Sequence, residues 1–432
     1  MKPNILFLFS DQQRWDTLGC YNPAIDFTPN IDSLAAEGVR LEHAFTCQPV
    51  CGPARACLQT GLYAARTGCY RNEIALPSDI KTIAECFHEN GYATAYVGKW
   101  HLANTGAKPV PAARRGGYHD YWMAADVLEF TSDGYGGHMF NKDEECVDFT
   151  GYRADCQTDF VLDYLQNRQK DKPFFLFVSY LEPHHQNDAG HYQGPIGAKE
   201  RFQDYPIPHD LQAFEGDWAQ EYPDYLGCCA SLDSNVGRIV QLLKQQGEYE
   251  NTLIVYTSDH GSHFKTRNGE YKRSCHDSCV RVPLILRGPG FVGGKTITEL
   301  ASLIDLPITL LHSAEIEAPG LQGMPLQHDD RPQEVFIQIS ENHVGRAIRT
   351  KRYKYAVKAP FRHGWLHASA RIYREEFLYD LGKDPHELNN LVNCAEYKQV
   401  CAQLRKQLVQ CMVQAGEKAP VILNGRWRPC HR

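Results

Sequence analysis

The sequence lacks several features that would place the protein in a broad class at once. It has no apolar run of the roughly 18–20 residues that span a bilayer. It has no internal repeat, no low-complexity tract and no stripe of lysine or arginine. Together with a net charge of −7, this argues against a nucleic-acid-binding protein. Any anion-binding site must therefore be built locally from a few cationic side chains.

A secretory signal is also missing from the N-terminus. The apolar stretch there covers only residues 5–9, which is too short for a signal peptide and suits a buried strand of the mature fold. We therefore expect a cytoplasmic protein as numbered, or a periplasmic or secreted one from which a signal has been removed.

The 16 cysteines do not form the dense framework of a small disulfide-stapled domain, because they are scattered along a long chain. We expect most of them to be free thiols. Two groups contain ligand types that bind zinc, but neither has the paired C-x-x-C spacing of a zinc site: Cys47, Cys51 and Cys57, and Cys275, His276 and Cys279.

A chain of 432 residues is long enough for two structural units. A composition shift near residues 322–332 suggests the boundary, giving a large unit over 1–325 and a smaller one over 326–432. In the large unit, apolar strand-like runs alternate with helical periodicity over 31–37, 83–90, 158–167 and 225–247, which predicts an α/β sandwich.

Four of the apolar runs end in bursts of polar residues, as parallel strands do when their carboxyl ends build a site. These runs cover residues 4–10, 93–97, 174–181 and 253–257. A further buried strand is expected at 281–286 and a helix at 303–312. The stretch 103–151, rich in Gly and aromatic residues, has no clear period and predicts long loops over the site. Its aromatic side chains suit plain packing better than stacking on sugar rings.

The smaller unit has a different pattern. Residues 334–340, 345–358 and 376–381 are typical of strands in a small antiparallel sheet, and residues 395–414 of a helix that follows it.

The stretch from Thr46 to Leu62, TCQPVCGPARACLQTGL, is the centre of the sequence. Pro53 suits the first turn of a helix that ends at Gly61, so Cys51 is expected at a helix N-terminus. Free backbone N–H groups and the helix dipole favour an anion there, and Arg55 lies one turn further along the same face.

The C-x-P-x-R pattern resembles the signature of type I sulfatases in the alkaline phosphatase superfamily. The resemblance covers most of the chain, including G-K-W-H-L, P-H-H, S-D-H-G and R-V-P-L-I-L-R-G-P-G. It implies an alkaline-phosphatase-like sandwich with a large, mostly parallel central sheet and a small C-terminal antiparallel sheet and helix. It also implies that a maturase oxidises Cys51 to formylglycine.

The resemblance further implies a divalent cation held by Asp11, Gln12, Asp259 and His260 together with the oxidised Cys51. Oxygen ligands favour Ca²⁺, with Mg²⁺ or Mn²⁺ as alternatives. The sequence departs from the commonest family pattern at two of these positions, with Gln12 in place of a second Asp and His260 in place of Asn.

Formylglycine hydrates to a geminal diol, and one ionised hydroxyl attacks sulfur while the other later expels sulfate. By the resemblance, Arg55 and Lys99 orient the diol and bind sulfate, and His101 is the base. His184 protonates the leaving group and Lys272 contacts the sulfate and ester oxygen. Because His184 and His185 are adjacent, a shift of one residue would exchange their roles.

Polar and aromatic residues in predicted loops suit a sulfated mono- or oligosaccharide as substrate: Arg14, Arg71, His185, Asn187, His191, Arg362, His363 and Trp365. Two other functions compete with this prediction. A phosphonate monoester or phosphodiester hydrolase resembles the chain in the same motifs, and a non-catalytic binding protein would keep the fold but not the chemistry.

Overall fold

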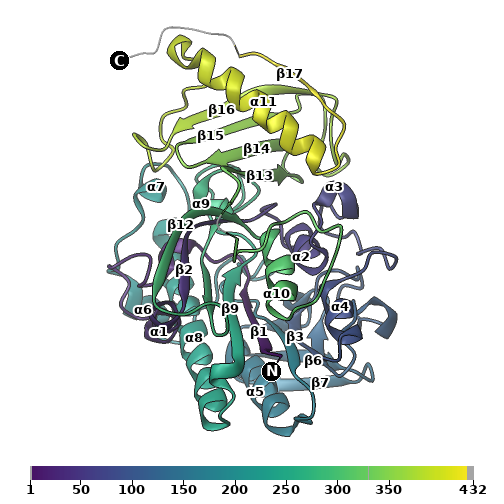
Figure 1. Cartoon of the computed structure of the whole chain (residues 1–432). Coiled ribbons are helices and arrows are strands. Elements are labelled where there is room, and N and C mark those ends of the chain that lie inside the picture. The colour runs from purple at the N-terminus through teal and green to yellow at the C-terminus, as the bar shows by residue number, and fades with distance from the viewer. Residues whose placement is uncertain (1, 329, 426–432) are drawn as a thin grey trace.

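The computed structural model describes residues 2–328 and 330–425, which form a large unit with a smaller one on top of it (Figure 1). The large unit is built on a twelve-stranded sheet. Its strands are β1 (Asn4–Ser10), β2 (Val39–Phe45), β3 (Ala93–Lys99), β4 (Tyr121–Ala125), β5 (Ser132–Asp133), β6 (Gly136–Asn141), β7 (Cys146–Thr150), β8 (Phe174–Ser179), β9 (Thr252–Ser258), β10 (Arg281–Val282), β11 (Leu284–Arg287) and β12 (Lys295–Ser302).

The helices of the large unit lie between these strands in the chain, except α10, which follows β12. They are α1 (Pro29–Glu37), α2 (Cys51–Thr60), α3 (Ala64–Thr67), α4 (Ile83–Glu89), α5 (Arg153–Asn167), α6 (Ala198–Phe202), α7 (His209–Gln212), α8 (Trp218–Gln245), α9 (Asp277–Val280) and α10 (Asp305–Ser313). None of the helices in the described ranges is long and apolar enough to cross a membrane.

The centre of the sheet is parallel, in the order β9-β1-β8-β3-β4. Its strands are buried on both faces, and β1 shows how side chains alternate between two cores. Ile5, Phe7 and Phe9 face one core, while Leu6 and Leu8 face the other. Helices α2, α4 and α10 cover the first face, and helices α1, α5 and α8 cover the second. The four strands predicted to end in polar residues are neighbours here, so their carboxyl ends meet at one edge.

Two predictions for the large unit are wrong. Residues 103–151 are not all loop, because β4 joins the parallel centre beside β3 and the short strands β5, β6 and β7 extend that side as antiparallel partners. Strands as short as these give too few residues for a period to be visible in the sequence. The buried strand predicted at 281–286 is split by Pro283 into β10 and β11, and β11 runs antiparallel to β9.

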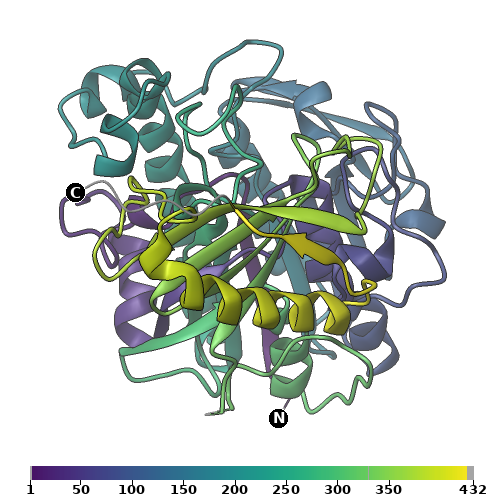
Figure 2. The ribbon, with the colours of Figure 1, turned by 90° about the horizontal axis from the view of Figure 1, so that it is seen from above.

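The smaller unit contains a five-stranded sheet and one long helix, α11 (Lys398–Gln414). Its strands are β13 (Glu334–Ile339), β14 (Gly345–Thr350), β15 (Tyr353–Lys358), β16 (Ile372–Asp380) and β17 (Val421–Leu423). Strands β13 to β16 are antiparallel and β17 adds in parallel. Seen from above, α11 lies across this sheet (Figure 2), and Leu404, Leu408 and Met412 pack against it. The predicted small sheet and its following helix are confirmed, although the run at 345–358 forms two strands, β14 and β15, and β17 was not predicted. The boundary at residues 325/326 stays a prediction.

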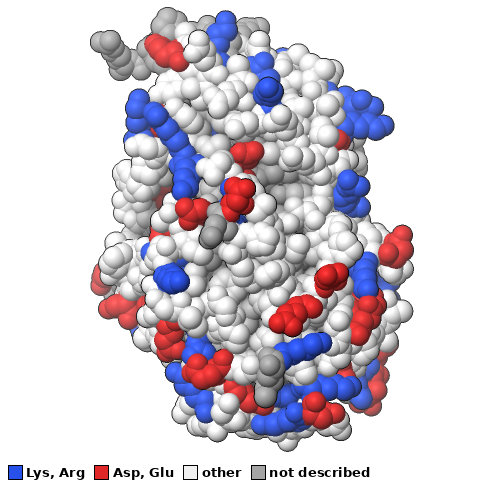
Figure 3. Space-filling model, in the orientation of Figure 1, with Lys and Arg blue, Asp and Glu red and all other residues white. Residues whose placement is uncertain are grey.

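Charged side chains of both signs are interspersed on the face shown in Figure 3, without a patch of one sign. This agrees with the lack of a basic stripe in the sequence. Three cationic side chains, Arg55, Lys99 and Lys272, are buried inside the molecule.

Candidate active site

Cys51 is the first residue of α2, as the sequence predicts, and the whole helix is buried. Val50 is extended, and Gly61 ends the helix in the left-handed conformation with φ of 66°. The backbone N–H of Gly52 donates to Asn72 Oδ1 at 3.0 Å, which satisfies one of the free donors of the first turn. Cys51 itself is only 1% exposed. The Cys51 side chain is therefore held in the protein interior.

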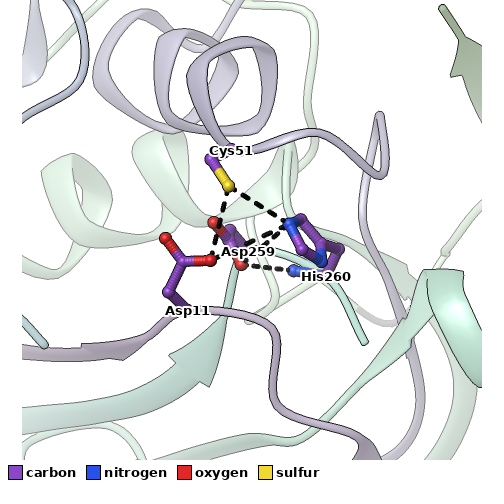
Figure 4. A group of neighbouring side chains, drawn as sticks. All are labelled: Asp11, Cys51, Asp259 and His260. Carbon is purple, nitrogen blue, oxygen red and sulfur yellow. Dashed lines mark hydrogen bonds and ion pairs between the residues drawn. The ribbon is translucent and has the colours of Figure 1, made fainter. Parts of the chain in front are cut away.

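Four side chains that can bind a metal meet at this point (Figure 4). The ligand atoms of Asp11, Cys51, Asp259 and His260 all lie within 4.8 Å of one another. Cys51 Sγ is 3.4 Å from Asp11 Oδ1 and 3.4 Å from His260 Nε2. His260 Nδ1 donates to the carbonyl of Gly261 at 2.9 Å, which leaves the lone pair of Nε2 free for a metal.

Gln12 adds an oxygen beside this group. Its Nε2 donates to Tyr192 Oη at 2.6 Å and to Ser262 Oγ at 3.2 Å, whereas its Oε1 is buried without a hydrogen-bond partner. Burial and the neighbouring Asp11 raise the pKa of Asp259 to about 7, and Asp259 Oδ2 also lacks a hydrogen-bond partner. Unsatisfied buried oxygens around crowded carboxylates fit a divalent cation.

Arg55 and Lys99 approach the same carboxylate from two elements. Arg55 Nη2 is 2.9 Å and Lys99 Nζ is also 2.9 Å from Asp11 Oδ2. Arg55 Nη1 donates to Ser179 Oγ at 2.6 Å. Lys99 ends β3 beside β8, and Gly98 makes this possible, because a Cβ there would lie 2.0 Å from the carbonyl oxygen of Ser179.

Lys272 lies on the other side of Cys51. Its Nζ is 3.0 Å from Cys51 Sγ and 3.2 Å from His184 Nε2. Burial opposes ionisation of the Cys51 thiol, but Lys272 and Lys99 outweigh it and lower the pKa of Cys51 well below its usual range. The pocket is therefore arranged to hold negative charge at this position.

The two predicted proton-transfer histidines are both at the site. His101 follows β3 with φ of 59° and adds a hydrogen bond that lowers the pKa of Cys51. His184 is buried, and its Nε2 is 3.9 Å from Asp11 Oδ1. His185 instead stacks on Tyr271, with ring centroids 4.9 Å apart. The structure thus places His184, and not His185, against Lys272 and Asp11.

The residues predicted to contact substrate are divided. Arg71 stacks over the ring of Trp365 at 4.6 Å, and both side chains are partly exposed. The backbone N–H of Trp365 donates to His363 Nδ1 at 3.3 Å, and Arg362 is exposed in the same loop. These four residues therefore come together on one surface loop and its neighbour.

The Tyr271 hydroxyl donates to Asn187 Oδ1, so Asn187 and His185 meet at the residue before Lys272. His191 is turned to the backbone, with Nδ1 2.8 Å from the carbonyl oxygen of Tyr192.

Arg14 has no donor left for a substrate, contrary to the prediction. It is 1% exposed, and all of its N–H groups are engaged by Asp16, by Asp210 and by the carbonyl of Ser262. In the sequence, a cationic residue after a strand suggests a substrate-binding residue. In the structure, Asp16, which is near in the chain, and Asp210, which is distant in it, neutralise Arg14.

Sequence reasoning missed several residues of the site. Glu129 Oε2 lies 3.2 Å from Lys99 Nζ, Ser179 accepts from Arg55, and Asn72 caps the first turn of α2. Glu129 belongs to the short 3-10 helix η3 (Leu128–Phe130), inside the stretch without periodicity. No signal in the sequence marks it. Among the described residues, a second cluster of possible metal ligands is formed by His138, Cys146 and Asp148; Cys47, Cys57, Cys275, His276 and Cys279 belong to neither cluster.

Comparison with known proteins gives a consistent result. The family model Sulfatase matches residues 3–316, and the model for the C-terminal part of N-sulphoglucosamine sulphohydrolase matches residues 269–414. The chain is 30% identical to the uncharacterized sulfatase YidJ of Escherichia coli, over 95% of this chain and 87% of that protein. It is 25% identical to an N-acetylglucosamine-6-O-sulfatase of Bacteroides thetaiotaomicron, over 95% of this chain and 86% of that protein.

Solved structures share the fold. One, bound to its substrate D-glucosamine-2-N,6-O-disulfate, has a TM-score of 0.79 at 24% identity and covers 97% of this chain and 99% of its own. A phosphonate monoester hydrolase of Agrobacterium radiobacter has a TM-score of 0.70 at 22% identity and covers 96% of each chain. At these identities the two structures support the fold and not the substrate. The family model and the relative at 30% identity decide the family: the chain belongs to the sulfatases, which are sulfuric ester hydrolases.

Proposed function

We propose that this protein removes sulfate from a sulfated mono- or oligosaccharide, with a formylglycine made from Cys51 by a maturase and one divalent cation. The observation that carries the proposal is the position of Cys51 Sγ. It lies between a group of metal-binding side chains and Lys272 Nζ at 3.0 Å. The name of the N-acetylglucosamine-6-O-sulfatase relative supports a sugar as the substrate.

Asp11, Gln12, Asp259 and His260 are the residues that would hold the cation. Three of these four side chains offer oxygen, so Ca²⁺ is our first choice, with Mg²⁺ or Mn²⁺ as alternatives because His260 offers nitrogen. When bound, the cation and the formylglycine supply an activated oxygen nucleophile for attack on sulfur.

The three cations of the pocket bind and orient the transferred group. Lys99 and Lys272 present their ammonium groups beside the reactive position, and burial strengthens their attraction for a sulfuryl group. Arg55 is held by Ser179 and Asp11 and keeps the reactive side chain oriented. Because these side chains are already ordered, little reorganisation is needed when the substrate binds.

Proton transfer is assigned to the two histidines. His101 accepts a proton at the reactive side chain, and His184 Nε2 gives one to the leaving sugar oxygen. Burial and the adjacent Lys99 and Lys272 lower the pKa of His184 in the free enzyme. An anionic ester bound beside His184 raises that pKa again, so that binding the substrate favours the protonated acid.

Arg71, Trp365, His363 and Arg362 are our candidates for contact with the sugar beyond the scissile bond. The indole ring of Trp365 gives an apolar face for a pyranose, and arginine gives donors for hydroxyl or further sulfate groups. Asn187 and His185, joined through Tyr271, are candidates on the side of Lys272.

A paired hydrolysis assay tests the proposal. Matured protein is given 4-nitrophenyl sulfate, a phenyl phosphonate monoester and a panel of sulfated monosaccharides, and the mass of the peptide that contains Cys51 is measured to show the aldehyde. We expect sulfate release from at least one sugar, faster by several orders of magnitude than phosphonate cleavage. Faster phosphonate cleavage would instead support the phosphonate monoester or phosphodiester hydrolase.

A further inference from the structure

Glu129 is a carboxylate placed among the cations of the pocket. Its Oε2 is 3.2 Å from Lys99 Nζ, and the same Nζ is 2.9 Å from Asp11 Oδ2. Lys99 therefore bridges two buried carboxylates. Only one of them, Asp11, belongs to the group of metal-binding side chains.

Glu129 carries its charge at neutral pH. Burial would raise its pKa, but Lys99, His184 and His101 lower it to about 2. Its buried Oε2 faces the Lys99 ammonium and has no other hydrogen-bond partner. Glu129 thus adds a buried negative charge, paired with Lys99, near the residues that surround Cys51.

Glu129 is one of three carboxylates that lie among three cations around Cys51. Arg55, Lys99 and Lys272 are the cations, and Asp11, Asp259 and Glu129 are the carboxylates. After β1, the residue next to Asp11 is the neutral Gln12. The third carboxylate of the pocket therefore lies against the lysine that binds the transferred group, and not on the metal.

We propose that Glu129 sets the charge selectivity of the pocket, favouring a singly charged sulfuryl ester over a doubly charged phosphoryl ester. The inference rests on the proposed function. An aryl sulfate carries one negative charge, whereas an aryl phosphate carries nearly two at pH 7 because its second pKa is about 6. Repulsion by Glu129 acts on each of these charges, so it penalises the phosphate about twice as much.

The test measures kcat/KM of matured, metal-loaded enzyme for 4-nitrophenyl sulfate and 4-nitrophenyl phosphate. In Glu129→Gln we expect the ratio of sulfate to phosphate hydrolysis to fall by about 10- to 100-fold, because the substitution removes one charge at nearly constant shape. The ratio does not depend on the fraction of enzyme that is folded or matured, since both substrates are measured on the same preparation.

Two further variants separate charge from packing. Glu129→Asp keeps the charge and should keep the ratio within about threefold of the wild type. Glu417→Gln removes a buried carboxylate from an ion pair with Arg346 at 2.6 Å in the smaller unit, and it should leave the ratio unchanged.

An unchanged ratio in Glu129→Gln, or equal losses on both substrates, would overturn the inference and leave Glu129 as a support for Lys99. A wild type that carries the aldehyde and hydrolyses no sulfate ester would overturn the proposed function itself. The two failures are therefore distinguishable in one set of assays.

Discussion

Two groups of buried charge in this molecule have similar composition and opposite uses. The first surrounds Cys51. The second, which we call the Lys354 cluster, consists of Lys354, Arg349, Asp277 and Glu387. Lys354 Nζ pairs with Asp277 and with Glu387 Oε1 at 2.6 Å, and Asp277 N–H donates to Glu387 Oε2 at 2.7 Å. This cluster fastens strands β14 and β15 to helix α9 of the large unit.

The difference lies in what is left unsatisfied. Around Cys51, the buried Gln12 Oε1 has no hydrogen-bond partner, and Asp259 Oδ2 has only a long ion pair with Arg55 at 3.7 Å. In the Lys354 cluster, Arg349 Nε and Glu387 Oε1 are without a hydrogen bond, but the latter is within ion-pair distance of Lys354. Buried charge alone therefore does not identify an active site; convergent atoms that need an outside partner do.

The largest effect that we expect is the loss of activity when Cys51 is replaced. Cys51→Ala removes the reactive side chain, so kcat/KM for sulfate esters should fall by about 10⁴-fold or more while the chain still folds. Steady-state kinetics and circular dichroism measure the two properties. Cys57→Ala, in the same helix but in the hydrophobic core, is the matched control and should keep its activity. Full activity of Cys51→Ala would refute the assignment of the reactive position.

His184→Ala tests whether His184, in the group around Cys51, protonates the leaving group. We expect losses of about 10²–10⁴ in kcat/KM on sugar sulfates, because an alkoxide leaving group needs a proton. The loss on 4-nitrophenyl sulfate should be much smaller, since nitrophenolate leaves without one. Comparing the two substrates on one variant is the measurement, and equal losses on both would rule out the acid role.

Lys354→Met should spare the chemistry and weaken the fold. The substitution leaves Glu387 buried without its cation and Asp277 with Arg349 alone, which costs about 3–5 kcal/mol in the free energy of unfolding. Urea denaturation measures this cost, and kcat/KM per folded molecule should stay close to that of the wild type. As a control, Lys351→Ala breaks a half-exposed pair with Glu299 and should cost less than about 1 kcal/mol. If Lys354→Met cost no more than this control, the cluster would not fasten the two units.

The smallest expected effect is a pH dependence beside the Lys354 cluster. Burial, Arg267 and Lys354 lower the pKa of His276 well below its ordinary value of 6.5. Below pH 6.5 the unfolded chain therefore binds a proton at His276 that the folded chain does not, and stability is lost as the pH falls. His276→Gln should reduce the slope of unfolding free energy against pH, between pH 6 and 5, by about 1.4 kcal/mol per unit. Urea denaturation at several pH values measures the slope, and identical slopes in both proteins would contradict this account.

The sequence was most informative where local patterns and chain topology agree. Strand β1 lies at the predicted residues, and Asp11, Lys99, His184 and Asp259 follow parallel strands whose ends must meet. Cys51 was placed at a helix start by Pro53 and Gly61. These features depend on short stretches of chain, so their consequences can be read without knowing the packing.

Other features depend on contacts between distant residues and were not predictable. Glu129 reaches Lys99 from a 3-10 turn of three residues, which has no periodicity to detect. The ion pair of Arg14 cannot be predicted from the sequence because its partner Asp210 is 196 positions away. The strands β5, β6 and β7 were missed because antiparallel pairing, and not a run of apolar residues, holds them in the sheet.

The burial of α2 has a consequence for the order in which the chain folds and Cys51 is modified. Every residue from Cys51 to Thr60 is buried, and only 1% of Cys51 is accessible. Under the proposed function, an enzyme that oxidises Cys51 cannot reach it once the chain has folded, so maturation has to happen on the nascent or unfolded polypeptide. The maturase would then recognise a linear segment, which explains why the signature is contiguous while the rest of the site is dispersed over more than 200 residues. Oxidation of Cys51 would have to precede folding, and any molecule that folded first would stay inactive.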